Sequence, residues 1–167
     1  LFPYTTLFRS AADLVTAYEE VKQALGLTES VEDMAKSTAV SSMVYANRPG
    51  DGSAREQAAS CQRVLGGGAN IAIEYATKRY RSNVINWGML PFLTSEEDSK
   101  TMAVGDYVYV PNVRDQLFSD SDDYKAYVIS GGVKKAEITL HLGHLSDEEK
   151  DIIAAGCLIN YYANGKA

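Results

Sequence analysis

Cysteine is scarce in this sequence, with Cys61 and Cys157 the only two among 167 residues. Two thiols are too few for the disulfide framework that holds small secreted proteins together, so the sequence favours a reducing, cytoplasmic setting. Long apolar runs are lacking too, because no stretch reaches the 18 or so residues that a membrane-spanning helix requires. We therefore expect a globular chain.

Positive charge is in deficit. The 16 lysine and arginine residues face 22 aspartate and glutamate residues, for a formal net charge of −6. This sign disfavours nonspecific binding to nucleic acid or to anionic lipid. A small anionic substrate remains compatible with it, because arginine and backbone amides clustered at one place can oppose the global charge. Hydrophobic residues at 46% and charged residues at 23% indicate an ordered chain of about one domain.

The first ten residues, LFPYTTLFRS, read like a translated sequencing adapter. They lack the basic start, apolar stretch and small-residue cleavage site of a signal peptide. We exclude residues 1–10 from fold and function as a non-native adapter-like scar, and expect a fragment whose N-terminal part is missing. Residues 11–38 are expected to form a helical lead-in, and residues 39–167 the main domain.

Apolar periodicity and turn signals divide the chain into short elements. We predict helices at 11–25, at 31–36 with Ser30 as its cap, at 53–65 and at 75–87, and strands at 39–46, 69–73, 106–110, 124–129 and 136–142. Residues 89–92 are expected to be extended, because the residue before a proline avoids the helical region. An acidic loop is expected at 95–100. Ser146 and Glu149 form a capping box that starts a last helix towards Tyr161. Strands and helices alternate early and strands cluster late, which predicts a layered α/β fold.

The stretch from Gly50 to Gln57, GDGSAREQ, carries the strongest chemical signal. Its glycines let the backbone approach a ligand closely, and a helix starts directly after them with free N–H groups at its positive end. Arg55 adds a forked donor that matches a carboxylate, and the Ser53 hydroxyl would lie where these groups stabilise its deprotonated form. A purely structural interpretation stays open, because Ser53-x-x-Glu56 is also the pattern of a capping box.

Other groups carry weaker signals. His141 and His144 are three residues apart but have no acidic or cysteine partner nearby, so we predict no metal site. Cys61 and Cys157 are interpreted as core residues on helices. The glycines at 66–68 follow a helix and precede a strand, the reverse of a dinucleotide-binding turn.

Four stretches in order resemble the aconitase and isopropylmalate isomerase superfamily. GDGSAREQAASCQRVLGG (50–67) is similar to its G-x-G-S-S-R-E-H-A-A…LGG signature, and RSNVINWGMLPF (81–92) to its R-S-N-L-I-N-x-G-I-L-P-L stretch. GDYVYVPNVRDQL (105–117) and LSDEEKDIIAAGCLINYY (145–162) resemble two later segments of the family. The resemblance implies the C-terminal swivelling domain, with a layered β/β/α fold.

The resemblance also implies an activity: a hydro-lyase that adds or removes water at a hydroxy-polycarboxylic acid such as citrate or isocitrate. By position in the motif, Ser53 is the catalytic base and Arg55 binds a carboxylate, with Gly52, Ser53, Ala54 and Arg55 together as the substrate-binding residues. A [4Fe–4S] cluster would be held by cluster-bearing domains missing from this chain, which should be inactive alone.

Departures from the family pattern leave the substrate open. Ala54 replaces the second serine of the motif, Gln57 replaces its histidine, and Lys78-Arg79-Tyr80 replaces R-I-H. One alternative is a noncatalytic domain that binds RNA or protein, for which the stretch 78–81 offers a basic and aromatic patch. Another is the small subunit of a two-subunit isomerase.

Overall fold

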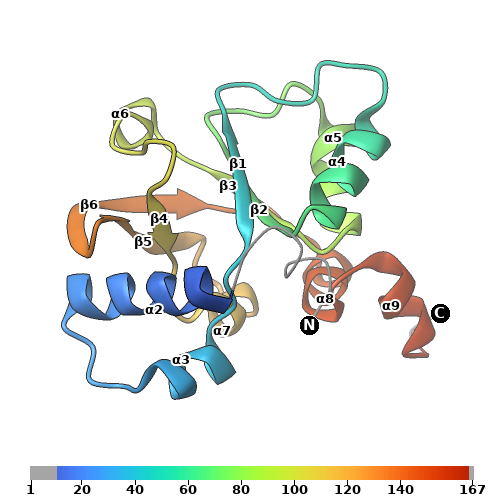
Figure 1. Cartoon of the computed structure of the whole chain (residues 1–167). Helices are drawn as coiled ribbons and strands as arrows, with labels where there is room; N and C mark the ends of the chain where they lie inside the picture. Colours follow the sequence, from blue (N-terminus) through green and yellow to red (C-terminus); the bar gives the residue numbers. More distant parts are fainter. Residues whose placement is uncertain (1–10, 166–167) are drawn as a thin grey trace.

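The computed structural model describes residues 11–165, so the adapter-like segment lies outside the described residues (Figure 1). A mixed six-stranded sheet has the order β1-β2-β3-β6-β5-β4. The strands are β1 Ser42–Ala46, β2 Gly67–Ala72, β3 Leu90–Leu93, β4 Tyr107–Tyr109, β5 Asp123–Ser130 and β6 Val133–His141. The helices are α2 Ala11–Leu25, α3 Val31–Ser37, α4 Arg55–Val64, α5 Lys78–Asn86, α6 Glu96–Ser99, α7 Val113–Leu117, α8 Asp147–Ala155 and α9 Leu158–Ala163. The predicted α/β class is confirmed.

The sheet has a parallel half and an antiparallel half. Strands β1, β2 and β3 run parallel, joined by the crossover helices α4 and α5. Strands β6, β5 and β4 pair antiparallel. The halves meet at one antiparallel pair, Leu93 with His141. Because parallel strands end at the same edge, the loops after β1, β2 and β3 come together.

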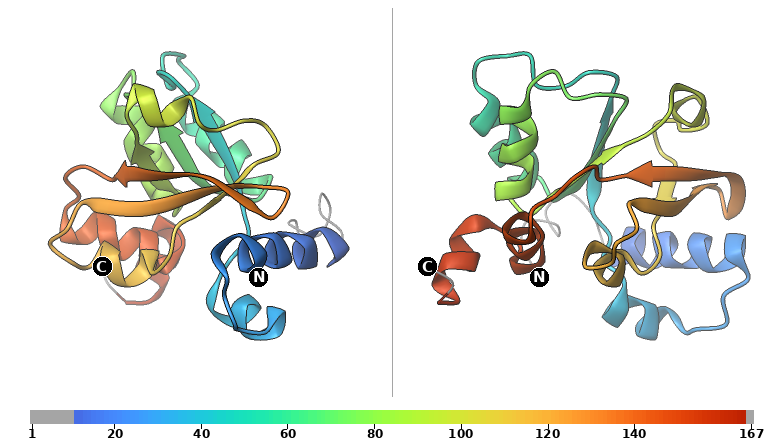
Figure 2. Two further views of the ribbon diagram at one scale, coloured as in Figure 1. Left: turned by 90° about the vertical axis from the view of Figure 1, so that its left-hand side faces the viewer. Right: turned by 180° about the vertical axis from the view of Figure 1, so that it is seen from behind.

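Helices cover both halves. Helices α4 and α5 pack on the parallel half through a cluster of Ala59, Tyr80, Val84 and Met89. Helices α2 and α3 lie at the opposite end, under the antiparallel half (Figures 1 and 2). The main core takes residues from both halves of the sheet. Among them are Phe92 and Tyr124, whose ring centroids lie 5.3 Å apart in an edge-to-face arrangement.

The helical lead-in packs on the sheet. Tyr18 and Val21 of α2 and Met34 of α3 form a cluster with Ile129 of β5. The Tyr18 hydroxyl donates to the carbonyl of Thr38 over 2.7 Å. Helices at both predicted positions are confirmed, including Ser30 as the cap of α3. The domain boundary at residue 38 stays a prediction.

Several local predictions were wrong, and one helix was missed. The acidic stretch 95–100 contains the short helix α6, capped by the Ser95 hydroxyl, and α7 was not predicted. The last helix is broken at Gly156, whose left-handed backbone (φ +87°) ends α8. Cys157 is consequently the extended residue before α9, and Cys61 is exposed instead of buried.

No helix among residues 11–165 is long and apolar enough to cross a membrane.

Candidate active site

The loop that carries GDGSAR connects the carboxyl end of β1 to the first turn of α4. The neighbouring loop, residues 73–77, connects β2 to α5. Ligands of open sheets with parallel strands bind outside the carboxyl ends of those strands. Both loops therefore lie where a ligand site is expected.

Hydrogen bonds join the two loops residue by residue. The amide of Glu74 donates to the carbonyl of Asn47 over 3.1 Å, and the amide of Ala76 donates to the carbonyl of Pro49 over 2.9 Å. Arg48 Nε lies 2.7 Å from Glu74 Oε1. The first part of the loop after β1 is thus held in place before the motif begins.

Gly50 is the last residue of this held part. The Thr77 hydroxyl donates to its carbonyl over 3.1 Å. Gly50 has φ +96°, and a Cβ there would lie 2.5 Å from Cβ of Tyr80. Both the backbone conformation and the close approach of Tyr80 require glycine at this position.

Beyond Gly50 the loop is open to solvent. Gly52, Ser53 and Ala54 are exposed, and a Cβ added to Gly52 would meet no described atom within 4 Å. The capping-box interpretation of Ser53 and Glu56 was wrong. Helix α4 begins at Arg55 with Ala54 as its N-cap, and no side chain of the described residues caps it. The Ser53 hydroxyl is left available.

Arg55 is the first helical residue of α4, and its Nε is buried with no hydrogen-bond partner within residues 11–165. The amide of Ala58 donates to the carbonyl of Ala54 over 3.0 Å, so the amides before it in the first turn have no intrahelical acceptor. These N–H groups, the positive end of the helix and the guanidinium can together bind an anion.

The basic stretch on α5 is split between different surroundings. Lys78 and Arg79 are exposed, whereas Tyr80 is 5% exposed and its hydroxyl accepts from Asn70 Nδ2 over 3.0 Å. Arg81 Nη2 donates to the carbonyl of Leu142 over 2.8 Å. The predicted basic and aromatic patch is therefore not one continuous exposed surface.

Two further titratable groups are Tyr75, in the loop before α5, and His141, at the end of β6. Burial raises the pKa of Tyr75, with Tyr80 as a smaller cause, so the phenol stays protonated at neutral pH. His141 Nδ1 lies 3.0 Å from Asp123 Oδ1, so the expectation that this histidine has no acidic partner nearby was wrong: β5 pairs Asp123 directly with His141. In the part of the chain that the structure describes, no group of three or more His, Cys, Asp or Glu residues is placed to hold a metal ion. These residues do not fit the ligand set of a cluster.

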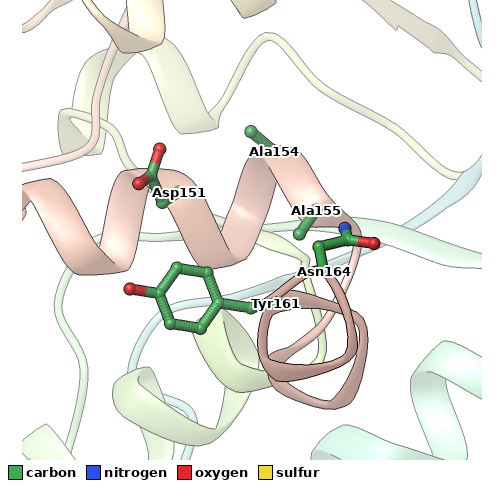
Figure 3. Close-up of a pocket in the computed structure, with 5 residues that line it drawn as sticks. All are labelled: Asp151, Ala154, Ala155, Tyr161 and Asn164. Atoms are coloured by element: carbon green, nitrogen blue, oxygen red, sulfur yellow. The ribbon is translucent and has the colours of Figure 1, made fainter. Parts of the chain in front are cut away.

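Two cavities are lined by residues of the helices and their ends. Figure 3 shows one of about 150 Å³ between α8 and α9, lined by Asp151, Ala154, Ala155, Tyr161 and Asn164. Another, of about 210 Å³, is lined by Glu56, Asn83, Asn86, Trp87, Cys157, Leu158 and Ile159. Neither of these two described cavities is lined by Ser53 or Arg55, so the candidate site is an open surface of this chain.

Residues 9–97 match the family model of the aconitase C-terminal domain, a range that contains Ser53, Arg55 and the whole stretch 81–92. The chain belongs to the aconitase C-terminal domain family. Domains of this family do not themselves bind the iron–sulfur cluster and work with a cluster-bearing domain or subunit. The resemblance noted in the sequence is thus confirmed. The similar segments 105–117 and 145–162 lie beyond the matched range.

A solved structure, 3-isopropylmalate dehydratase from Methanocaldococcus jannaschii, is similar to this aconitase C-terminal domain with a TM-score of 0.56. The two chains are 23% identical, over 89% of this chain and 78% of the other. At that identity the likeness shows the fold alone. No curated protein matches the chain.

Proposed function

We propose that this chain provides the proton-accepting serine and a carboxylate-binding arginine to a hydro-lyase that acts on a hydroxy-polycarboxylic acid. Ser53 is the base, and Gly52, Ala54 and Arg55 form the substrate-binding loop with it. The cluster-bearing domains belong to a partner or to another part of the enzyme.

The observation that carries this proposal is the buried Arg55 Nε, which has no hydrogen-bond partner within residues 11–165. It lies at the start of α4, which no described side chain caps, and two residues from the exposed Ser53. A buried donor left unpaired costs about 1–3 kcal/mol, more when it is charged, so such a group is maintained where a ligand satisfies it. A carboxylate has the charge and the geometry to do so.

The chemistry of the loop follows from these groups. One substrate carboxylate accepts hydrogen bonds from Arg55 and from the first-turn amides of α4. The Ser53 oxygen takes a proton from the carbon beside that carboxylate, and the same cationic surroundings stabilise the serine alkoxide needed for this step. A cluster held elsewhere would act as Lewis acid on the departing hydroxyl, and no residue of this chain is assigned to that step. Ala54 offers only its backbone amide.

The test is turnover by the complete enzyme, with the cluster-bearing domains reconstituted anaerobically with iron and sulfide. A panel of hydroxy-polycarboxylic acids is followed by absorbance of the unsaturated product. We expect Ser53→Ala to lower kcat about 10²- to 10⁴-fold, the contribution typical of a positioned acid or base. Arg55→Lys should raise KM about tenfold, because an ammonium cannot make the bidentate contact.

Matched controls lie on α4 and on the neighbouring helix α5. Ser60 is on α4 with its hydroxyl donating to the carbonyl of Gln57, and Arg79 is exposed on α5. Ser60→Ala and Arg79→Lys should leave kcat and KM near the wild-type values. A cluster-loaded enzyme that turns over equally well with Ser53→Ala contradicts the proposed role of this serine.

A second candidate is a small subunit that pairs with a separate cluster-bearing subunit, because domains of this family work with a cluster-bearing domain or subunit. Light scattering of the chain mixed with a separately expressed cluster-bearing protein distinguishes the two arrangements. A stable complex in light scattering supports two subunits. Hydro-lyase activity that appears only when the two proteins are fused supports a single chain.

A further inference from the structure

The Thr77 hydroxyl makes two hydrogen bonds at once. It accepts from the amide of Tyr80 over 3.3 Å, which makes Thr77 the N-cap of α5, and it donates to the carbonyl of Gly50 over 3.1 Å. One oxygen therefore ties the start of α5 to the loop that carries Ser53. Capping alone needs only the first of these bonds.

Gly50 marks the boundary between the held and the exposed parts of the loop after β1. The backbone pairing of the two loops ends at Pro49, and the residues from Asp51 to Ala54 are exposed. The Tyr80 side chain packs against Gly50, and Tyr80 is itself fixed by Asn70 Nδ2. Within residues 11–165, the Thr77 bond is thus the last polar contact before the two residues, Asp51 and Gly52, that lead to Ser53.

We propose that Thr77 is a positioning residue, which sets the place of the Ser53 hydroxyl by holding the Gly50 carbonyl against the start of α5. This inference rests on the proposed function of Ser53 as the base. Thr77 need not touch the substrate. Its effect appears in the proton-transfer step, because proton transfer is sensitive to the position of the base.

Three substitutions separate capping from positioning. Thr77→Val keeps the shape and removes both hydrogen bonds, whereas Thr77→Ser keeps both. Thr77→Gly removes the hydroxyl at little cost to the helix, since glycine is tolerated at an N-cap, and it serves if the valine variant does not fold. Ser95→Ala is the matched control, because Ser95 caps α6 and, among residues 11–165, makes no hydrogen bond to the loop after β1.

The measurement is kcat and KM of the reconstituted enzyme for each variant. We expect Thr77→Val and Thr77→Gly to lower kcat about tenfold to a hundredfold, the loss typical of a group misplaced by about 1 Å, with KM changed less than about threefold. Thr77→Ser and Ser95→Ala should stay near the wild-type kcat. In the Ser53→Ala background, Thr77→Val should cause no further loss, because the residue acts through Ser53.

Each other outcome decides against the inference. If Thr77→Val and Thr77→Gly leave kcat unchanged while Ser53→Ala lowers it, the inference is overturned and the proposed function stands. An equal loss with Thr77→Ser, or a further loss in the Ser53→Ala background, also overturns it. Turnover that survives Ser53→Ala overturns the proposed function and the inference together.

Discussion

Trp87 Nε1 donates a hydrogen bond of 3.1 Å to Glu56 Oε1, joining the end of α5 to the first turn of α4. The Glu56 carboxylate is used in this tertiary contact instead of reaching back to Ser53. At α8 the same S-x-x-E pattern behaves differently, because Ser146 and Glu149 make both bonds of a capping box. One sequence pattern thus has two structural outcomes, and tertiary contacts decide between them.

This difference predicts unequal effects on stability for two serine substitutions. Ser146→Ala should lower the free energy of unfolding by about 1 kcal/mol, because a helix cap is lost. Ser53→Ala should change it by less than about 0.5 kcal/mol, since its hydroxyl caps no helix among the described residues. Urea unfolding followed by circular dichroism measures both. A loss at Ser53 equal to that at Ser146 would restore the capping interpretation.

A pair of glycines separates backbone strain from steric conflict. Gly50 and Gly105 have nearly the same φ, +96° and +95°. A Cβ at Gly105 would meet no described atom within 4 Å, whereas one at Gly50 would overlap Tyr80. Gly105→Ala should cost about 1–2 kcal/mol of stability, the cost of a left-handed backbone, and Gly50→Ala should cost clearly more. Equal losses in thermal unfolding would mean that Tyr80 moves aside freely.

The pH dependence of stability should report the Asp106–Lys135 pair. Lys135 Nζ lies 2.6 Å from Asp106 Oδ2, and this bond holds the pKa of Asp106 below its usual value. A depressed carboxyl pKa in the folded state stabilises the protein above the unfolded pKa of about 3.9, and this contribution is lost as pH falls through the folded pKa. Asp106→Asn should therefore flatten the decline in unfolding free energy between pH 5 and pH 2.

Lys135→Met provides the control for that experiment. It removes the main cause of the depressed pKa, so its pH profile should resemble that of Asp106→Asn, and the double variant should add nothing further. Carboxyl carbon shifts in an NMR titration follow Asp106 directly. An unchanged midpoint in Lys135→Met would show that other donors, such as the amide of Ala103, are the main cause.

Features that depend on neighbours in sequence could be predicted from it. The apolar face of α2 and the caps at Ser30 and Ser146 are set by residues within one or two helical turns, and all were predicted. The loop at Gly50 and the family were also predictable, because the motif is contiguous. The break at Gly156 was not, because the same apolar pattern continues through it into α9.

Contacts between distant residues could not be predicted. A Cβ on Gly88 would overlap the carbonyl oxygen of Gly156, so the ends of α5 and α8, which are 68 positions apart in the sequence, pack closely together. The bond from Thr77 to Gly50 spans 27 positions and depends on the pairing of two loops. The unpaired Arg55 Nε is likewise a property of burial, visible only in the folded chain.

We expect the Arg55 side chain to lower the free energy of unfolding of the unliganded chain and to be required for ligand binding. A cation in the first turn of a helix opposes the helix dipole, and its buried Nε has no acceptor among the described residues. Arg55→Met keeps much of the length and apolar contact of the side chain and removes both costs. We expect it to raise the free energy of unfolding by up to about 1 kcal/mol while it abolishes ligand binding.

Calorimetry of this chain with and without a tricarboxylate tests both halves of that expectation. The ligand should raise the melting temperature of the wild-type chain, because it binds the folded state, and should leave that of Arg55→Met unchanged. Arg79→Met, at an exposed position on α5, is the matched control and should keep the wild-type response. If Arg55→Met is less stable than the wild type, the guanidinium supports the fold, and its unpaired nitrogen no longer argues for a ligand. If both variants keep the response to tricarboxylate, the anion binds elsewhere on the domain.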